Sequence, residues 1–560
     1  MKKIIFKWSA LVLFPLLMVG CSDFLTEEPL ASSTKDDYYR TPYQLQESLN
    51  GVYDILQSNL YNNCEWIFGE ACGDDVLGND EYSSNQIAEL VNFRFNTSNT
   101  WILNRYTVNY RGISRANQVI ANVHKVKLAS NDYGNYTTVR EILGQAKFLR
   151  AMFYFNLVKT YGGVPIRPEV EDINNLVIPR NTKEEVYAYI EKDLREAAIM
   201  VQSKYTDNNL GKAGRGSVLA LLMKVMLYQA TPGVYSDKWE EIVALGDHLI
   251  VGKDISMGEL LKFNQLYTED WESMRTRLWF KPAALSAATD PIETPSTVVG
   301  NVANQFSMDY TGIYGDALNY WEIFTQKGEF YRGSYFEVMF KESADGTGGD
   351  TNEGTGIFQD IYATRMWTSP TLFDVIKNDP RVSQVIARHG TGTPDGERVE
   401  SVENRYVCLK WYTPKRERPL YTDDYAKNRR VLRYPDVLLM YAEALNECGK
   451  GAEALIQLNK VKSAANKINN TATLYTSGGY GYMRDQIWAE RRLELCHEWD
   501  RFFDIVRQGR AARIFRAFAS ESSTTHKRGQ LFIEGVNEIF PIPQTEIDLS
   551  NGVVTQNPGY

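Results

Sequence analysis

The chain has 560 residues, 43% of them apolar, and it carries 61 basic against 70 acidic side chains, a formal net charge of −9. This length and apolar content suffice to bury a large core, which excludes an intrinsically disordered protein. The acidic balance, without any cluster of basic residues, excludes a protein that binds nucleic acid.

The first twenty residues are typical of an export signal. Three lysines precede an apolar stretch at residues 8–19, and Cys21 follows it after small and apolar residues. The stretch contains Pro15 and is shorter than the roughly twenty residues that a membrane-spanning helix needs. We therefore expect a segment that is removed during processing.

The position of Cys21 predicts a lipoprotein. We expect residues 1–20 to be a lipoprotein signal peptide, Cys21 to carry the lipid, and residues 21–40 to form an extended acylated tether, because the residues after Cys21 are polar and acidic. The alternative is an ordinary secretory signal followed by a coincidental cysteine. Loss of the leader would leave 58 basic against 70 acidic residues.

Five further cysteines are scattered along the chain, which is not the pattern of a disulfide framework. Cys64 and Cys72 are close enough in sequence to form a disulfide in an oxidising compartment. Buried free thiols are the alternative, and both interpretations remain open.

Residues 41–260 show the 3.6-residue periodicity of amphipathic helices. Thr41, Pro42 and Gln44 have the signature of a capped helix start, and Thr182 with Glu185 has the signature of a capping box. The predicted helices cover residues 42–56, 101–123, 141–161, 183–201, 217–230 and 237–250.

A helical pair is predicted at residues 435–465. Ala442 and Ala454 lie twelve residues apart, with Leu445 and Leu458 following them at helical spacing. This alternation of small and large residues is typical of a tetratricopeptide pair, in which small residues let two helices approach. A generic helical hairpin is the alternative. The fold class we expect is mainly α, a tetratricopeptide-like α-α superhelix with a loop-rich irregular region and a few short strands.

The periodic pattern fades at residues 261–430. This region carries short apolar runs, aromatic residues and glycine-rich tracts at residues 345–350 and 389–396, which indicate loops or small hairpins. Long irregular segments on a rigid scaffold are often where ligands bind, although a solvated insertion has the same composition. We treat residues 261–560 as a second region, with a helical part at about 431–515, in one folded unit with residues 41–260.

Familiar catalytic motifs are absent from the sequence. It contains no zinc-protease His-Glu-x-x-His, no Gly-x-Ser-x-Gly, no Cys-x-x-Cys and no phosphate-binding loop. A glycosidase needs only two facing carboxylates, so hydrolysis stays open. Glu490, Glu494 and His497 have helical spacing that would suit a metal or acid-base site, but neighbouring arginines favour buried ion pairs instead. We expect no cofactor and no metal.

Nine sequence blocks, read together, resemble the SusD/RagB family, the outer-membrane nutrient-binding lipoproteins of starch-utilisation-type systems. The resemblance spans nearly the whole chain. The blocks are CSDFL (21–25), RGISRAN (111–117), GQAKFLRAMFYF (144–155), YGGVP (161–165), RYPDVLLMYAEA (433–444), ERRLE (490–494), WDRFFD (499–504), FPIPQTEI (540–547) and QNPGY (556–560).

The resemblance implies a non-catalytic protein that is lipid-anchored to the outer membrane and exposed at the cell surface. Such a protein captures oligo- or polysaccharide and delivers it to a TonB-dependent, SusC-like transporter. A peptide-binding member of the same family is one alternative. A surface glycoside hydrolase is another.

The family's binding sites combine an aromatic and a polar residue near the start of an early helix with aromatic residues from later loops. Trp101 and Asn104 best fit the first description. Aromatic rings stack on the apolar faces of sugars, whereas amides exchange hydrogen bonds with the hydroxyls. The further candidates for ligand binding are Tyr314, Tyr320 and Trp321 in the later loops, with Trp66 and Asp75 at the rim.

Overall fold

The computed structural model describes residues 38–78, 86–129, 132–167, 176–279, 294–341, 366–399, 405–418, 425–521 and 529–560. The predicted signal peptide, the lipidation site Cys21, most of the tether and the glycine-rich tract at residues 345–350 lie outside the described residues.

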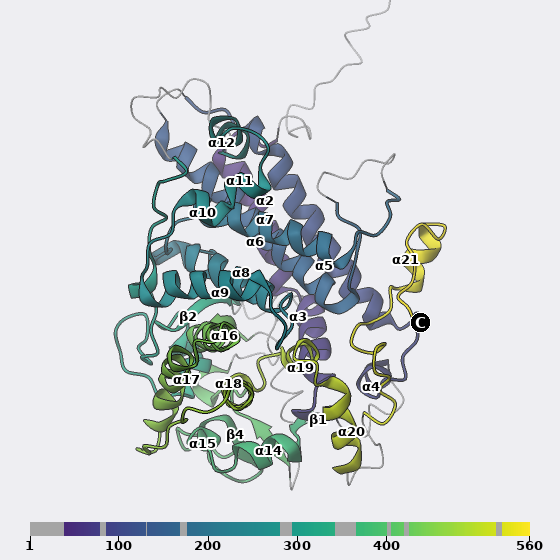
Figure 1. The fold of residues 1–560 in the computed structure, drawn as a ribbon, viewed down its shortest axis with the longest axis vertical. Coiled ribbons are helices and arrows are strands. Elements are labelled where there is room, and N and C mark those ends of the chain that lie inside the picture. Colours follow the sequence, from purple (N-terminus) through teal and green to yellow (C-terminus); the bar gives the residue numbers. More distant parts are fainter. Residues whose placement is uncertain are drawn as a thin grey trace, which may run out of the picture.

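Helices make up most of the described chain (Figure 1). In the first half they are α2 (Pro42–Gln57), α3 (Asn59–Trp66), α4 (Gln86–Val91), α5 (Thr100–Asn122), α6 (Tyr133–Tyr161), α7 (Lys183–Met200), α8 (Arg215–Leu227), α9 (Asp237–Gly246), α10 (Met257–Leu261), α11 (Phe263–Leu266) and α12 (Trp271–Trp279). In the second half they are α14 (Pro370–Ile376), α15 (Val382–Val385), α16 (Tyr434–Glu447), α17 (Gly451–Asn466), α18 (Tyr480–Leu495), α19 (Arg501–Arg507), α20 (Ala511–Glu521) and α21 (Gln544–Leu549).

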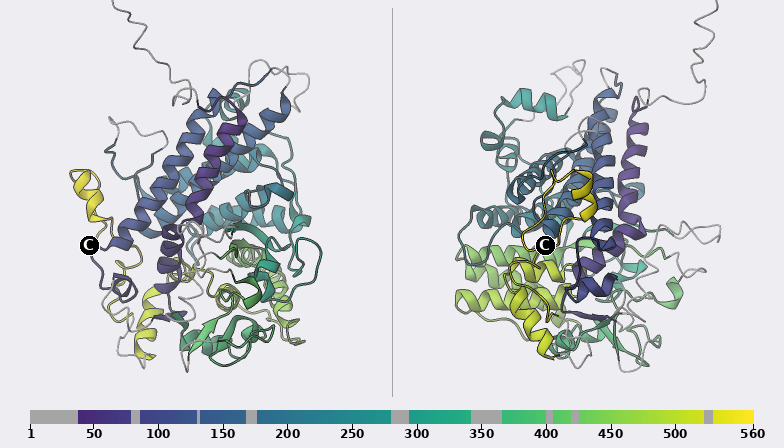
Figure 2. Two further views of the ribbon diagram at one scale, coloured as in Figure 1. Left: turned by 180° about the vertical axis from the view of Figure 1, so that it is seen from behind. Right: turned by 90° about the vertical axis from the view of Figure 1, so that its right-hand side faces the viewer.

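Successive helices pack against one another to form a scaffold. Helix α5 packs on α6, α6 on α7, α7 on α8 and α8 on α9, while α2 lies against both α5 and α6. The series continues with α16, which packs on α9, α17 and α18. Figure 1 shows the long helices above this second group, and the right-hand view in Figure 2 shows the C-terminal segment lying along the side of the long helices. The predicted tetratricopeptide-like helical scaffold is confirmed.

Local capping signals place the helix starts as predicted. The Thr41 side chain accepts a hydrogen bond from the Gln44 amide, and the Gln44 side chain accepts one from the Thr41 amide. Thr182 and Glu185 form the same reciprocal pair at the start of α7. These bonds satisfy amides that a helix start would otherwise leave unpaired, so they locate the first turn from sequence alone.

Close helix approach depends on small residues at the crossings. A Cβ atom on Gly112 of α5 would come within 2.4 Å of the Phe153 ring of α6. A Cβ atom on Gly246 of α9 would come within 2.2 Å of the Tyr441 ring of α16. Each glycine therefore provides the space into which a large residue of the neighbouring helix packs, as in tetratricopeptide pairs.

Three two-stranded antiparallel sheets lie in the described part of the chain. They pair β1 (Val76–Gly78) with β3 (Met366–Thr368), β2 (Ser334–Val338) with β6 (Arg429–Arg433), and β4 (Ile386–Arg388) with β5 (Tyr406–Cys408). The registers pair Val76 with Thr368 and Ile386 with Cys408, whereas β2 and β6 are irregular. Strands β2 to β5, with α11, α12, α14 and α15, give the region at 261–430 more regular structure than the predicted loops and hairpins.

Two helix boundaries differ from the prediction. Helix α6 begins at Tyr133, not residue 141, because Asp132 caps it and its first turns bury Tyr136 and Val139 at helical spacing. Helix α9 ends at Gly246 and continues as a π-helical turn, Asp247–Val251. None of the described helices combines the length and apolar character needed to cross a bilayer.

Buried charges join the helices of the second half, as the sequence predicted. Arg381 has no exposed surface and contacts Asp379, Glu490 and Glu494, each at 2.7 or 2.8 Å. Arg433 adds a second contact to Glu494 at 3.0 Å. Because every charge has an opposite partner, the network avoids the cost of an isolated buried ion.

A candidate ligand groove along helix α5

The start of α5 is held in place by Asn99. Its side chain accepts a hydrogen bond from the Trp101 amide at 3.0 Å and donates to the Gln86 carbonyl and to Glu89, each at 2.9 Å. These bonds tie the first turn of α5 to α4. The first turn carries Trp101, and Asn104 follows one turn later, so both side chains project from a fixed backbone.

A groove of about 400 Å³ runs along the next turns of α5. We call it the α5 groove. It is lined by Tyr106, Thr107, Tyr110, Arg111, Ser114 and Arg115 of α5, by Arg167 from the segment after α6, and by Glu546 of α21. This volume lies within the range of small-molecule and oligosaccharide sites.

The opposite wall of the groove comes from distant parts of the chain. The Gln544 amide at the start of α21 donates to the Thr97 carbonyl at 2.9 Å, and the Thr97 hydroxyl donates to the Gln544 side chain at 3.2 Å. The Tyr110 hydroxyl donates to the Pro165 carbonyl at 2.7 Å. The C-terminal segment and the segment after α6 are therefore fixed against α5 by direct hydrogen bonds.

Two tyrosine rings form part of the groove lining. The rings of Tyr106 and Tyr110 lie 4.7 Å apart between centroids. Burial raises the pKa of the Tyr106 hydroxyl, and the nearby carboxylate of Glu546 raises it further. Burial likewise raises the pKa of Tyr110, so both phenols are neutral at physiological pH and do not act as acids or bases. Tyr106 is buried and Tyr110 is half-buried, so Tyr110 is the ring of this pair that offers surface to a ligand.

Two polar side chains of α5, Asn104 just before the groove and Arg111 in its lining, have no hydrogen-bond or ion-pair partner in the described part of the chain. Asn104 is half-buried, and its amide makes no hydrogen bond with any described residue. Arg111 is exposed, and no carboxylate in the described part of the chain pairs with it. Amide and guanidinium groups of this kind bind the hydroxyl and carboxylate oxygens of a ligand.

Of the described residues that line the groove, Glu546 is the one that carries a carboxylate. Hydrolysis of a glycosidic bond ordinarily uses two facing carboxyl groups. The lining therefore suits binding of a polyhydroxylated ligand better than its cleavage.

Trp101 and Asn104, the two candidates from the early helix, lie at the start of α5, one turn before the groove-lining Thr107. Trp101 is partly buried against the main core and keeps some exposed surface. Their role in ligand binding stays a prediction.

Trp66 and Asp75 do not form a rim, which corrects the prediction. Trp66 is buried in the main core and its indole nitrogen donates to Asn63 at 2.9 Å. Asp75 is buried and pairs with Arg492 at 2.7 Å and with Arg501 at 3.6 Å. Both side chains are used to hold α3, β1, α18 and α19 together.

Tyr320 and Trp321 are also interior residues, which again corrects the prediction. Tyr320 lies in a buried cluster with Ile323 and Phe324 and donates to the Glu494 carbonyl at 3.3 Å. Trp321 is 0% exposed, and its indole nitrogen donates to the Leu409 carbonyl at 2.9 Å. A ring with no exposed face cannot stack on a sugar.

Tyr314 has the opposite environment, because it is 93% exposed. It lies in a turn that is closed by the pairing of Thr311 with Ala317. It is not among the residues that line the α5 groove.

Sequence reasoning did not identify the residues that line the groove as site residues. Thr107 and Arg111 follow Asn104 at helical spacing on the polar face of α5, and this periodic signal was available. Glu546 and Arg167 reach the groove only through tertiary contacts. No local pattern marks them.

The alternative acid-base or metal interpretation of Glu490, Glu494 and His497 is not supported. Glu490 accepts from Arg381 and Tyr475, and Glu494 contacts Arg381 and Arg433. His497 contacts Glu70 instead, at 3.2 Å. Within the described residues, no three His, Cys, Asp or Glu side chains are grouped as a metal ion would require.

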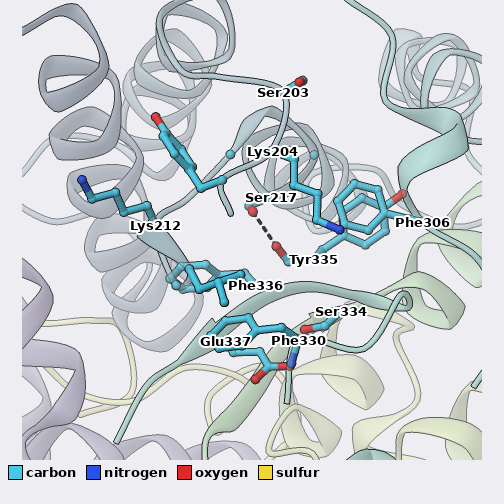
Figure 3. A pocket seen from close by; sticks show the side chains of 15 residues that line it. Ser203, Lys204, Lys212, Ser217, Phe306, Phe330, Ser334, Tyr335, Phe336 and Glu337 are labelled. Atoms are coloured by element: carbon cyan, nitrogen blue, oxygen red, sulfur yellow. Dashed lines mark hydrogen bonds between the residues drawn. The ribbon is translucent and has the colours of Figure 1, made fainter. Parts of the chain in front are cut away.

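A second opening, between β2 and the start of α8, is too small for a sugar ring (Figure 3). Its volume is about 50 Å³. Phe306 and Tyr335 stack across it at 3.9 Å, and the Ser217 hydroxyl donates to the Tyr335 carbonyl. These contacts make it a small gap in the packing, with room for about two water molecules.

The chain is similar to known proteins over almost its whole length. A family model described as "SusD family" matches residues 369–560, and one described as "Starch-binding associating with outer membrane" matches residues 23–227. SusD-like protein P25 of Formosa agariphila is 24% identical over 512 residues, which cover 88% of this chain and 87% of that protein.

Solved structures with the same fold include proteins named for their ligands. A laminarin-binding SusD-like protein aligns with a TM-score of 0.66 at 24% identity, covering 93% of this chain and 100% of that one. Surface glycan-binding protein A of Bacteroides thetaiotaomicron, in complex with laminarihexaose, aligns with a TM-score of 0.64 at 18% identity, covering 92% and 99%. Because the two family models match most of the chain and the fold agrees throughout, the chain belongs to the SusD/RagB family.

Proposed function

We propose that this protein is a non-catalytic glycan-binding lipoprotein of the outer membrane that captures oligo- or polysaccharide in the α5 groove. The observation that carries the proposal is the groove itself. It combines the half-buried ring of Tyr110 with hydroxyl and guanidinium groups, and Trp101 and Asn104 lie on the preceding turns of the same helix. Stacking surface next to unused hydrogen-bonding groups is what sugar recognition requires.

The relatives support this class of ligand. One family model carries the description "Starch-binding associating with outer membrane", and two solved structures of the same fold are named for laminarin and laminarihexaose. Sequence identity to these structures is below 25%, so the particular glycan is not carried over.

The remaining parts of the proposal concern placement and partner. Cys21 carries the lipid that anchors the protein at the cell surface, and the bound glycan passes to a TonB-dependent, SusC-like transporter. Capture and delivery of a glycan need no bond cleavage and therefore no pair of catalytic carboxyl groups. The single carboxylate in the described groove lining agrees with this role.

Calorimetry of the purified protein with a panel of oligo- and polysaccharides tests the ligand class. Trp101→Ala and Asn104→Ala should each weaken binding at least about tenfold, because each removes a ligand contact. Tyr482→Ala is a matched control, since Tyr482 is a 53% exposed aromatic residue at the start of α18. Equal loss with the control, or binding of peptides but not glycans, would contradict the proposal.

Three further measurements test the other parts. Release of reducing ends from a bound polysaccharide would show catalysis and overturn a purely binding role. Protease shaving of intact cells should remove the protein, and Cys21→Ala should release it from the membrane fraction. Co-purification with a TonB-dependent transporter from detergent-solubilised membranes tests the partner.

A further inference from the structure

The α5 groove carries an excess of positive charge, although the whole chain is acidic. Arg111, Arg115 and Arg167 line it, whereas Glu546 is the one carboxylate among the described lining residues. Arg115 is neutralised by Asp54 at 2.7 Å. Arg111 is exposed, lines the groove and has no acidic partner among the described residues.

A further arginine lies close behind the two tyrosines. Arg180 donates to the carbonyls of Gly163 and Thr555, each at 2.8 Å, and to the Asn557 side chain at 2.7 Å. All of these acceptors are neutral, so they bind the guanidinium without cancelling its charge. Burial lowers the pKa of Arg180, and the guanidinium remains charged at physiological pH.

This arrangement favours an anionic ligand over a neutral one. Arg111 and Arg180, which have no carboxylate partner among the described residues, repel each other weakly and raise the local positive potential. A carboxylate or sulfate group on the ligand would remove that repulsion and accept paired hydrogen bonds from Arg111. The half-buried ring of Tyr110 can contact the apolar face of the sugar ring.

We propose that the α5 groove selects an acidic saccharide, one that bears a carboxylate or sulfate group, and that Arg111 is the specificity-determining residue. The inference rests on the proposed glycan-binding function and names the ligand class for the same site. The shared chemistry is an oxyanion attached to a sugar ring. Uronic acids and sulfate esters are its two sources.

Pairs of saccharides that differ only in their acidic group separate the contribution of charge to affinity from that of the sugar ring. Calorimetry compares tetragalacturonic acid with its methyl ester, and a sulfated carrageenan oligosaccharide with its desulfated form. At least one acidic probe should bind ten times more tightly than its neutral counterpart. The pair that shows the preference identifies the source of the oxyanion. Raising the salt concentration from 50 to 500 mM should weaken acidic binding more than neutral binding.

Variants then assign the preference to a residue. Arg111→Gln should abolish the preference, lowering affinity for the acidic probe at least about ten times more than it lowers affinity for the neutral counterpart. Arg111→Lys should keep part of it, because the charge remains without the planar fork. Arg513→Gln, which removes an exposed arginine on α20, should change neither.

The outcomes distinguish the two proposals. Equal affinity for acidic and neutral partners, with binding still lost in Trp101→Ala, overturns the acidic preference and leaves the glycan-binding function intact. A preference that survives Arg111→Gln overturns the role of Arg111. Failure of the complete saccharide panel to bind overturns both proposals.

Discussion

Arg105 of α5 and Glu65 of α3 form a buried ion pair, with Arg105 Nη1 2.9 Å from Glu65 Oε1. Arg105 also donates to the Thr160 hydroxyl at 2.7 Å and to the Cys64 carbonyl at 3.1 Å. Burial raises the pKa of Glu65, but the charges of Arg105, Lys159 and Arg429, with the hydrogen bond from Arg105, together outweigh burial and hold that pKa below its ordinary value. These contacts fix the inner face of α5 to α3 and α6, whereas Arg111 lies on the exposed surface of the same helix.

Arg105→Met should destabilise the protein by about 3–5 kcal/mol, because it leaves Glu65 buried without its partner. Urea denaturation at pH 7 measures the loss. Arg105→Met combined with Glu65→Gln should recover part of it, since no unpaired charge then remains. A double variant as unstable as the single one would show that the ion pair is not the cause.

Trp321→Ala should destabilise the protein by about 3–5 kcal/mol, because the ring is completely buried and its removal leaves a cavity. Tyr314→Ala should change stability by no more than about 0.5 kcal/mol, because Tyr314 is almost fully exposed. Thermal unfolding of both variants checks the contrast. Comparable melting temperatures would contradict the interior position of Trp321.

Glu329→Gln should stabilise the protein at pH 8 and have little effect near pH 5. Burial raises the pKa of Glu329 to about 7 in the folded state, from an ordinary value near 4.5. The folded state thus holds a proton that the unfolded state has lost between these values, so the wild type loses stability as pH rises through 7. The gain at pH 8 is up to about 3 kcal/mol.

Denaturant unfolding of wild type and Glu329→Gln across pH 5 to 8 measures this difference. Glutamine can still accept the hydrogen bond that Glu329 receives from the Asn428 amide at 2.8 Å. A stability difference that does not grow with pH would contradict the raised pKa.

Four of the five described cysteines should resist alkylation in the native protein. Cys64, Cys72, Cys408 and Cys496 are buried free thiols, and burial raises the pKa of Cys64 and of Cys496 to about 12. Because the thiolate is the reactive form, iodoacetamide at pH 8 should label only the half-buried Cys448.

Mass spectrometry of labelled native and unfolded protein checks this expectation. All five thiols should react after unfolding without reductant. Protection of Cys64 and Cys72 in the unfolded state, removed by dithiothreitol, would show that the two form a disulfide.

The sequence by itself determined the scaffold, because helix starts and helix contacts are marked by residues close in the chain. Thr41 with Gln44 and Thr182 with Glu185 act over three residues, so the capping boxes were readable directly. The small-large spacing of Ala442 and Leu445 likewise predicted the α16–α17 pair, and both residues are buried.

The tertiary structure alone decided which aromatic residues are available to a ligand and which residues complete the groove. Trp321 is buried through a contact with Leu409, 88 residues away, and Asp75 is neutralised by Arg492, 417 residues away. Glu546 reaches α5 only because Gln544 pairs with Thr97. In irregular segments no periodicity separates the buried face from the exposed one, so burial there depends on distant contacts that a local pattern does not record.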